Sequence, residues 1–412
     1  PRYGKRNIAP IGDTHPGDYI EEIRACAADY EEIDPAFAKQ LRRFPESWDG
    51  ALDLAGRAFP GFGAMMRGHA YDEDRESFVT VKAGPARNHF QGDSLSFYFC
   101  SLGTPLAIDY ACHYSPRSWN ATSHNRPDMG ELRPVTIGEP RAFESSDVAD
   151  VFVADERTTR IQNLPLQTHN TLMPAREYPT VELDEANAWQ MRRYTMLVKH
   201  GKDSKIPDYL VVADEIDAPG PVGWNLHMLA RDIQRTGRTV TFLGQLDVDV
   251  DAHFLESPPL GNLEKRQWGW HGGAGQRRGL TGEAYEKEMV KALIPEDFEP
   301  GTWGTDGRNG ELAQWMRIPA PAGKTRWLVV LMPHRQGEPA AKVEKLSPTS
   351  ARVTLGEDSE VIHLGAGDGP QAAVERNGKT TVLLEIGELK PWADHEFRPL
   401  PPRRVVERME NP

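Results

Sequence analysis

Residues 88–109 read NHFQGDSLSFYFCSLGTPLAID, in which a polar segment leads into two short apolar runs. Because side chains alternate between the two faces of a β-strand, this stretch predicts that His89, Gln91 and Asp93 project to one side together. A second imidazole, His124, follows the stretch. Polar groups of this kind cost free energy to bury unless they bind something. The stretch therefore predicts a functional site on neighbouring β-strands.

The spacing of these residues resembles that of the heparinase II/III-like polysaccharide lyases. In that family a His-x-His-x-Asp strand runs into Gly-x-Pro-Leu-x-x-Asp, and a His-Asn pair follows a loop. The matching positions in this chain are His89, Gln91, Asp93, Ser96, Phe97, Gly103, Pro105, Leu106, Asp109, His124 and Asn125. The resemblance covers about residues 50–300 and is most specific at this motif.

Most of the chain consists of short β-rich runs joined by turns. These runs are residues 78–81, 95–102, 151–153, 194–198, 209–216, 239–243 and 327–332. The chain contains 37 glycines and 33 prolines, and Asn377-Gly378 between two apolar runs predicts a two-residue hairpin. This pattern predicts a mainly β fold in which large antiparallel sheets pack as a sandwich.

The first fifty residues have a different pattern. Apolar residues recur there at helical spacing, which predicts one helix over about residues 16–32 and a second over 34–44. The resemblance implies that residues 1–50 are the end of an α/α toroid and that residues 51–300 form a large antiparallel β-sandwich (a supersandwich). It implies that residues 301–412 form a smaller C-terminal β region. It also implies that part of the catalytic set lies on an N-terminal toroid domain absent from this chain.

The charge of the chain indicates which partners to expect. The formal net charge of −13 argues against a nucleic-acid partner. Between residues 82 and 126, however, cations and histidines outnumber carboxylates. This local excess predicts a positive cleft for an anionic polysaccharide or oligosaccharide, and chance clustering is the alternative.

No apolar run reaches the roughly 18 residues of a membrane helix, so we expect no membrane span. The chain begins with Pro1 and shows no signal-peptide pattern. We expect a periplasmic or secreted protein, or a cytoplasmic one that acts on imported oligosaccharides. The sequence predicts no particular oligomeric state.

The resemblance implies a lyase that cleaves a uronic-acid polysaccharide by β-elimination. On this interpretation His89 is the catalytic histidine, and Tyr114 is our candidate for a tyrosine acid or base. Asn88 and Arg67 are candidates to bind the substrate carboxylate. Each of these four residues has a structural alternative, such as a hydrogen bond within the sheet, plain packing or a salt bridge.

Three further residues in the segment before His124 are candidates for sugar binding, namely His113, Arg117 and Trp119. An aromatic ring can stack on a sugar while neighbouring cations meet its carboxylates. Trp119 could equally be an anchor in the core.

The resemblance also implies a structural metal, usually zinc, at the positions of Gln91, Asp109 and His124. The family has histidine where this chain has Gln91, and an amide oxygen is a poor zinc ligand. We therefore hold three outcomes open: a zinc ion, a harder cation such as calcium, or a hydrogen-bonded cluster without a metal.

Two other classes of function compete with the lyase. A non-catalytic carbohydrate-binding or structural β-sandwich would explain Gln91 and the missing toroid. A glycoside hydrolase with Asp93 and Asp109 as its paired carboxylates is a further alternative. Ultraviolet absorbance separates lyase from hydrolase, because only elimination leaves a conjugated unsaturated uronate.

Overall fold

The computed structural model describes six stretches of the chain together with a helical segment near the N-terminus. The described residues are 20–43 except 33; 55–84 except 60, 61, 71 and 73; 92–108; 124–134 except 131; 138–163; 180–270; and 311–385 except 368.

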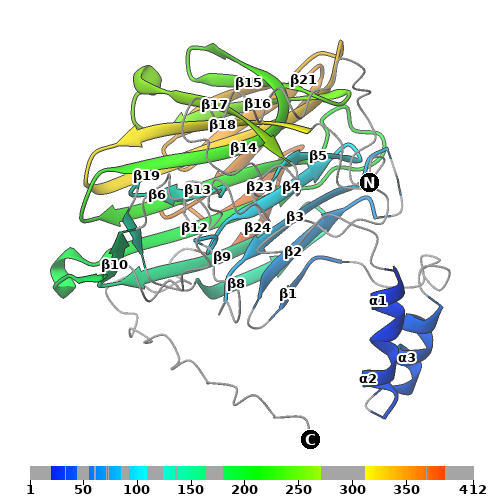
Figure 1. Ribbon diagram of the computed structural model, residues 1–412. Helices are drawn as coiled ribbons and strands as arrows, with labels where there is room; N and C mark the ends of the chain where they lie inside the picture. The colour runs from blue at the N-terminus through cyan, green and yellow to red at the C-terminus, as the bar shows by residue number, and fades with distance from the viewer. Residues whose placement is uncertain are drawn as a thin grey trace, which may run out of the picture.

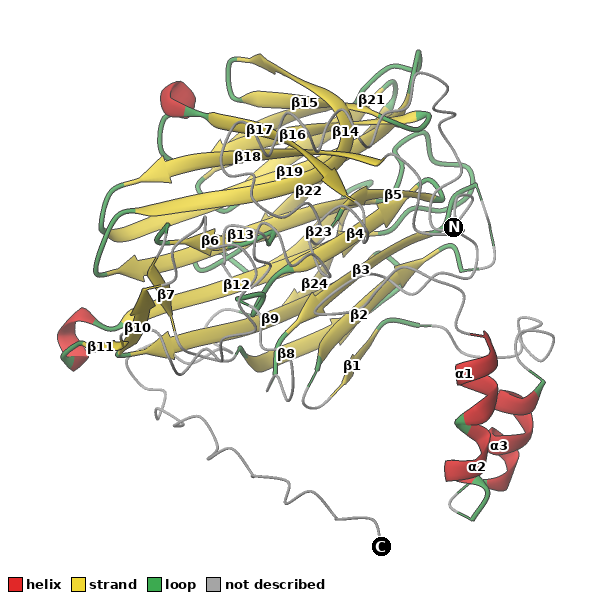
Figure 2. Cartoon of the chain, in the orientation of Figure 1, coloured by secondary structure: helices red, strands yellow, loops and turns green. Residues whose placement is uncertain are grey.

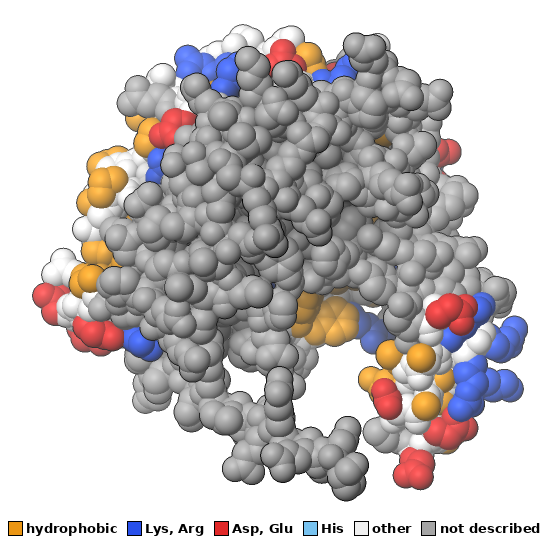
Figure 3. All heavy atoms as spheres, in the orientation of Figure 1, with side chains coloured by type: hydrophobic (Ala, Val, Ile, Leu, Met, Phe, Trp, Pro, Cys, Tyr) orange, Lys and Arg blue, Asp and Glu red, His pale blue; other side chains and the backbone are white. Residues whose placement is uncertain are grey.

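Three short helices form the N-terminal segment: α1 (Ile20–Ala25), α2 (Ala27–Tyr30) and α3 (Pro35–Arg42). They pack on one another through small buried side chains such as Ala27 and Ala38, and they carry both acidic and basic side chains on the face seen in Figure 3. The first predicted helix is divided at Cys26, which lies in a turn. No helix among the described residues is long and apolar enough to cross a membrane. That the helices end a toroid remains a prediction.

The largest sheet among the described residues is antiparallel and has sixteen strands. Figures 1 and 2 show how its strands are arranged. Its first part runs in the order β1 (Arg57–Phe59), β2 (Gly63–Gly68), β3 (Ser77–Lys82), β4 (Phe97–Ser101), β5 (Thr104–Ala107) and β14 (Val222–Thr236). Its second part continues through β15 (Thr239–Gly244), β16 (Val248–Glu256), β19 (Gly323–Arg335), β13 (Tyr209–Ala218), β12 (Trp189–Val198), β9 (Ala149–Thr158) and β8 (Glu139–Ser145). Off this path are β6 (Pro127–Asp128), β17 (Glu264–Trp270) and β18 (Glu311–Ala320).

The long strand β14 passes from one layer of the sandwich to the other. Its first half pairs with β18, and Met228 pairs with Ala107 of β5. Its second half pairs with β15, after a register shift between Ala230 and Asp232. A bulge bends a strand and increases its twist. One continuous sheet therefore folds into two facing layers, which confirms the predicted antiparallel β-sandwich.

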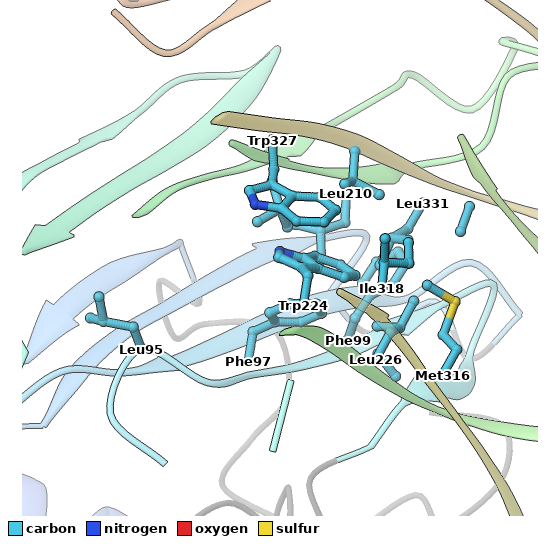
Figure 4. Close-up of a cluster of buried hydrophobic side chains, with 14 of the residues drawn as sticks. Leu95, Phe97, Phe99, Leu210, Trp224, Leu226, Met316, Ile318, Trp327 and Leu331 are labelled. Carbon is cyan, nitrogen blue, oxygen red and sulfur yellow. The ribbon is translucent and has the colours of Figure 1, made fainter. Parts of the chain in front are cut away.

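The space between these layers is filled by a large apolar core. The rings of Trp224 on β14 and Trp327 on β19 stack across it with centroids 6.0 Å apart, and Phe97 and Phe99 of β4 lie in the same cluster (Figure 4). Burying a large apolar side chain of this kind contributes about 1.5–3 kcal/mol. This core fixes β4, the strand that follows the predicted catalytic segment.

A separate five-stranded sheet packs on the outer face of the second layer. It consists of β20 (Lys342–Ser347), β21 (Ser350–Leu355), β22 (Asp358–Leu364), β23 (Ala372–Arg376) and β24 (Lys379–Leu384). A second apolar cluster joins its Ile362 and Leu364 to Tyr194 and Met196 of β12. Asn377 and Gly378 both have positive φ, 54° and 71°, between β23 and β24, which confirms the predicted two-residue hairpin.

The border of this small sheet differs from the predicted boundary near residue 300. Strands β18 and β19 fall within the predicted C-terminal region, yet both belong to the sixteen-stranded sheet. The alternation of side chains predicts that a segment is a strand but not which sheet it joins, so this boundary follows only from the pairing. A further three-stranded sheet contains β7 (Leu132–Pro134), β10 (Arg160–Asn163) and β11 (Thr180–Glu182).

Candidate active site

Most of the predicted site residues lie outside the described residues. These are Asn88, His89, Gln91, Asp109, His113, Tyr114, Arg117 and Trp119. Arg67 and His124 are described, and so are the chain segments that precede and follow the others. The roles assigned to the predicted residues therefore stay predictions. We call the described hydrogen bonds and ion pairs of Asn125, Arg126, Arg193 and Asp128 the frame of the site.

Arg67 lies on β2 and is engaged in an ion pair. Its Nη2 donates to Glu76, and its backbone N–H donates to Oδ2 of Asp150 over 2.9 Å. The Glu76 side chain is 8 % exposed, so this carboxylate has little water to stabilise its charge. A substrate carboxylate at Arg67 would have to share the guanidinium with Glu76.

Asp93 lies in a turn, not in the strand that the sequence predicts. The Ser96 backbone N–H donates to the Asp93 carbonyl over 2.9 Å, and β4 begins only at Phe97. The reason is Leu95, whose φ of 61° is left-handed and interrupts an extended chain. The expected alternation of His89, Gln91 and Asp93 on one strand therefore does not extend to Asp93.

The Asp93 carboxylate is buried and paired with a cation. Lys82, at the end of β3, donates its Nζ to Asp93 Oδ2, and Asp93 is 1 % exposed. The Lys82 carbonyl also accepts from the Leu95 backbone N–H over 2.8 Å. This pairing joins β3 to the turn, and it argues against Asp93 as one of the free carboxylates that a glycoside hydrolase needs.

Asn125, the residue after His124, binds three chain segments through its side chain. Its Nδ2 donates to the carbonyls of Phe97 and Ile108, each over 2.8 Å, and its Oδ1 accepts from the His227 backbone N–H over 2.6 Å. An amide side chain has two N–H donors and one carbonyl oxygen, and all are used here. The His124 side chain is fully buried. Since Ile108 directly precedes Asp109, the chain next to two predicted metal ligands converges on Asn125.

The next residue, Arg126, forms a buried pair with Glu156 of β9. Two hydrogen bonds of 2.9 and 2.8 Å join the guanidinium to both carboxylate oxygens, and Trp189 Nε1 donates to the same carboxylate over 3.1 Å. Arg126 Nη1 also donates to the Ser94 carbonyl. Bidentate pairs of this kind fix both distance and orientation. They fasten the turn at Ser94 and the chain after His124 to the second layer.

A second buried pair lies on the neighbouring strand. Arg193 of β12 binds both oxygens of Asp214 of β13 over 2.7 Å. Its Nη1 donates to the carbonyls of Leu95 and Asn125, each over 2.6 Å. Trp224 Nε1 completes the group by donating to Asp214 over 2.7 Å. The turn at Leu95 and the chain at Asn125 thus share one guanidinium.

The frame continues to Asp128 on β6. Burial raises the pKa of the Asp128 carboxyl, and this effect outweighs the opposing attraction of Arg317, whose Nη2 lies 3.1 Å away. Asn225 donates to Asp128 and also, over 2.8 Å, to the Arg126 carbonyl. Asp128 therefore serves as a hydrogen-bond acceptor inside the fold.

Arg126 and Arg193 were not among the residues predicted for this site. The signal was present in β12, whose sequence WQMRRYTMLV places two arginines inside an apolar run. Because Arg is almost never fully buried without a partner, such a strand predicts buried carboxylates elsewhere. The sequence does not indicate which carboxylates those are.

The described residues hold no group of three or more His, Cys, Asp or Glu side chains arranged to bind a metal ion. His124 is the one predicted metal ligand among them. The buried charges of Arg126, Glu156, Arg193 and Asp214 are paired with one another. Their chemical role is therefore to fix the positions of the backbone segments that they bind.

The comparisons with known proteins find similarity in structure only. No family model and no curated protein matches the sequence. A heparinase III structure, the BT4657 gene product, matches with a TM-score of 0.53 at 15% identity over 92% of this chain and 50% of its own. The heparan sulfate lyase HepC from Pedobacter heparinus gives 0.53 at 14% identity over 92% and 50%. Another heparinase III structure gives 0.54 at 12% identity over 94% and 52%.

These matches confirm the predicted resemblance at the level of the fold. The chain has the fold of the corresponding part of heparinase III and heparan sulfate lyase structures. It spans about half the length of the solved structures that it matches.

Proposed function

We propose that this chain belongs to a polysaccharide lyase that cleaves a uronic-acid-containing polysaccharide or oligosaccharide by β-elimination. The observation that carries the proposal is the heparinase-like fold over 92% of the chain, combined with the spaced motif from His89 to Asn125. In this fold, the described ends of the motif meet at the Asn125 and Arg193 hydrogen bonds. Alginate, a glycosaminoglycan or a related glucuronate glycan are the substrates that we propose.

The proposed reaction explains why the site needs these residue types. A base removes the C5 proton beside the carboxylate, and the C4 oxygen leaves with a proton. The C5 proton is very weakly acidic while the carboxylate keeps its charge, so the site must stabilise the doubly negative group that forms. A base and an acid with suitable pKa values must flank the carbon.

On this proposal four residues share the chemistry. His89 contacts the carboxylate or removes the C5 proton, and Tyr114 transfers a proton to or from the sugar. Asn88 and Arg67 bind the carboxylate and offset its charge. The ion pair between Arg67 and Glu76 tunes this last interaction, because Glu76 competes for the same guanidinium.

Substrate binding is proposed to involve His113, Arg117 and Trp119, with the cations meeting the sugar carboxylates. The matched structures are about twice as long as this chain, and we propose that an N-terminal toroid domain supplies the rest of the catalytic set. A periplasmic or secreted location suits a large extracellular glycan as substrate.

The family resemblance also suggests a structural zinc at Gln91, Asp109 and His124. His124 is fully buried, as a structural ligand should be, but an amide, one carboxylate and one imidazole form a poor donor set for zinc. We therefore derive no chemical step through a metal. The same three side chains would also suit a hydrogen-bonded cluster.

The test is the ultraviolet absorbance of products from alginate, heparan sulfate, hyaluronan and glucuronan oligosaccharides, with this chain alone and joined to its natural upstream sequence. A rise on one substrate with either protein supports elimination and names the substrate class. Cleavage without a rise in absorbance would indicate hydrolysis, and binding without cleavage would indicate a carbohydrate-binding module.

A further inference from the structure

Arg193 is 1 % exposed and lies on β12, in the layer opposite β4. We propose that Arg193 is a positioning residue for the proposed lyase site, because its guanidinium binds two described backbone segments, one that follows the predicted catalytic residues and one that follows the predicted ligand His124. The inference rests on the proposed function for its catalytic consequence. Its structural consequence can be measured without any activity.

The two carbonyls that Arg193 binds come from different parts of the motif. Leu95 follows the predicted catalytic segment, and Asn125 follows the predicted ligand His124. Nη1 reaches both carbonyl oxygens over 2.6 Å. A single nitrogen therefore sets the separation of two segments that are thirty residues apart in the sequence.

The Asn125 side chain adds a third segment to this unit. Its amide binds the carbonyls of Phe97 and Ile108, and its backbone N–H donates to Ser96 Oγ over 3.0 Å. Asn125 thus binds the chain directly before Asp109 and the start of β4, and it directly follows His124.

The backbone at Leu95 shows that this arrangement is imposed by its surroundings. A left-handed conformation is unfavourable for an L-residue with a Cβ, and it persists where neighbouring structure enforces it. The Leu95 side chain is fully buried in the core, while its carbonyl binds Arg193. These two contacts hold the φ of 61° and turn the chain just before β4.

Arg193 is itself held in one orientation. Asp214 binds its Nε and Nη2, and the Phe97 ring lies 5.4 Å from its Cζ. Trp224 fixes Asp214 in turn. Only a planar guanidinium offers a fork for the carboxylate and a further donor for the carbonyls. A lysine at this position keeps the charge but loses this geometry.

The competing explanation is that Arg193 is a buried ion pair that only stabilises the fold. The neighbouring residue provides a matched control for this explanation. Arg192 is 3 % exposed and binds both oxygens of Asp155 over 2.6 and 2.7 Å. Because neighbouring residues on a strand face opposite sides, Arg192 points away from the core that contains Leu95.

The experiment compares Arg193→Lys with Arg192→Lys in the chain joined to its natural upstream sequence. Amide hydrogen exchange is measured over residues 92–97 and 124–128, and kcat and KM are measured by ultraviolet absorbance. We expect Arg193→Lys to speed exchange several-fold in both segments and to lower kcat by about 10²-fold with little change in KM, as a small misplacement of reacting groups does. Arg192→Lys should leave both readouts near the wild-type values.

A second pair of variants distinguishes a positioning role of Arg193 from a role in stability alone. Replacing a buried ion pair by apolar residues of similar volume is often neutral or stabilising. The double variant Arg193→Met with Asp214→Leu should therefore fold, yet keep the fast exchange and the low kcat. The control is Arg192→Met with Asp155→Leu.

Unchanged exchange in both segments would overturn the proposal, whether or not the protein is active. So would a folded double variant with wild-type kcat, since stability alone would then explain Arg193. If the wild-type protein cleaves none of the glycans while Arg193→Lys still speeds exchange in both segments, the positioning role stands and the proposed lyase function is what fails.

Discussion

The guanidinium of Arg126 and the carboxylate of Glu156 form a bidentate pair between the two layers of the sandwich, with N–O distances of 2.9 and 2.8 Å. Both side chains are buried, at 3 % and 0 % exposure. Each charge is therefore stabilised by its partner and by fixed hydrogen bonds, not by water. Through this pair, and through Arg193 with Asp214, the chain around the predicted site is fastened to β9, β12 and β13.

Removing one partner of such a pair leaves an uncompensated buried charge. We expect Glu156→Gln to lower the free energy of unfolding by about 3–5 kcal/mol, measured by urea denaturation. The matched control is Glu182→Gln in the exposed pair of Arg160 with Glu182, which should cost about 0–1 kcal/mol. If both variants lost the same free energy of unfolding, burial of the Arg126–Glu156 pair would not matter for stability.

A buried histidine joins the five-stranded sheet to the second layer. His200 Nε2 lies 2.8 Å from Glu360 Oε1 on β22, and its Nδ1 lies 3.8 Å from Asp208 Oδ1. Burial lowers the pKa of His200, but the nearby carboxylates of Asp208 and Glu360 outweigh it and raise the pKa above its ordinary value. Arg376, His69 and Tyr209 are the other titratable or charged groups at this junction.

The direction of these shifts determines how stability depends on pH. Since the folded-state pKa of His200 is raised, its contribution is complete below the ordinary histidine pKa of about 6.5 and is lost as the pH rises through the raised value. Burial opposes ionisation of Asp208 and Glu360, yet their hydrogen bonds lower both pKa values. Their contribution is present above the ordinary carboxyl pKa and is lost as the pH falls through the lowered values.

We therefore expect the melting temperature to fall as the pH rises from about 6 to about 8.5, and His200→Gln to remove most of that slope. Thermal melts at a series of pH values measure it. His363→Gln, on the same strand as Glu360, is the control: burial lowers the pKa of His363, so its removal should make the fall with pH steeper, not flatter. A His200→Gln slope equal to that of the wild type would contradict the assignment.

The stacked tryptophans between the layers should dominate core stability. Trp327 is fully buried against Trp224, so Trp327→Ala should cost about 3–5 kcal/mol through lost burial and the cavity left behind. Val382→Ala, on an exposed position of β24, should change stability by no more than about 0.5 kcal/mol. Denaturant titration gives both values, and a small loss at Trp327 would mean that the core collapses around the change.

The proposed metal cluster makes its own prediction. If Gln91, Asp109 and His124 lie together, Gln91→His should create a stronger zinc site, because imidazole is a far better zinc ligand than an amide. Zinc content after dialysis and calorimetric titration measure the change. Gln234→His, at an exposed position of β14, is the control. Equal zinc in both variants would argue that the three residues do not share a site.

Much of the fold could be predicted because strands and turns leave local signals. The β-rich runs at 78–81, 151–153 and 209–216 all lie within observed strands, and Asn377-Gly378 forms the expected hairpin. These features depend on alternation and on residues that tolerate positive φ, both of which are visible in a short window of sequence.

The pairing of the strands and the buried ion pairs depend on contacts between residues far apart in the chain, and a single sequence does not show such contacts. Neither the return of β19 to the large sheet nor the pairing of Arg126 with Glu156 has a local signature. The turn at Asp93 was missed because Leu95 is a leucine, which gives no warning of a left-handed backbone. The pairing of Arg67 with Glu76 was not predicted either, because a contact between two chain segments has no local signature in the sequence.

The most direct test of the central claim is the ultraviolet absorbance produced by wild type, His89→Ala and His363→Ala on the glycan panel, using the chain joined to its natural upstream sequence. We predict that wild type and His363→Ala release unsaturated uronate from at least one substrate, while His89→Ala is folded and inactive. A folded His89→Ala variant that eliminates at the wild-type rate would contradict the proposed site, and no absorbance from the wild type would contradict the lyase itself.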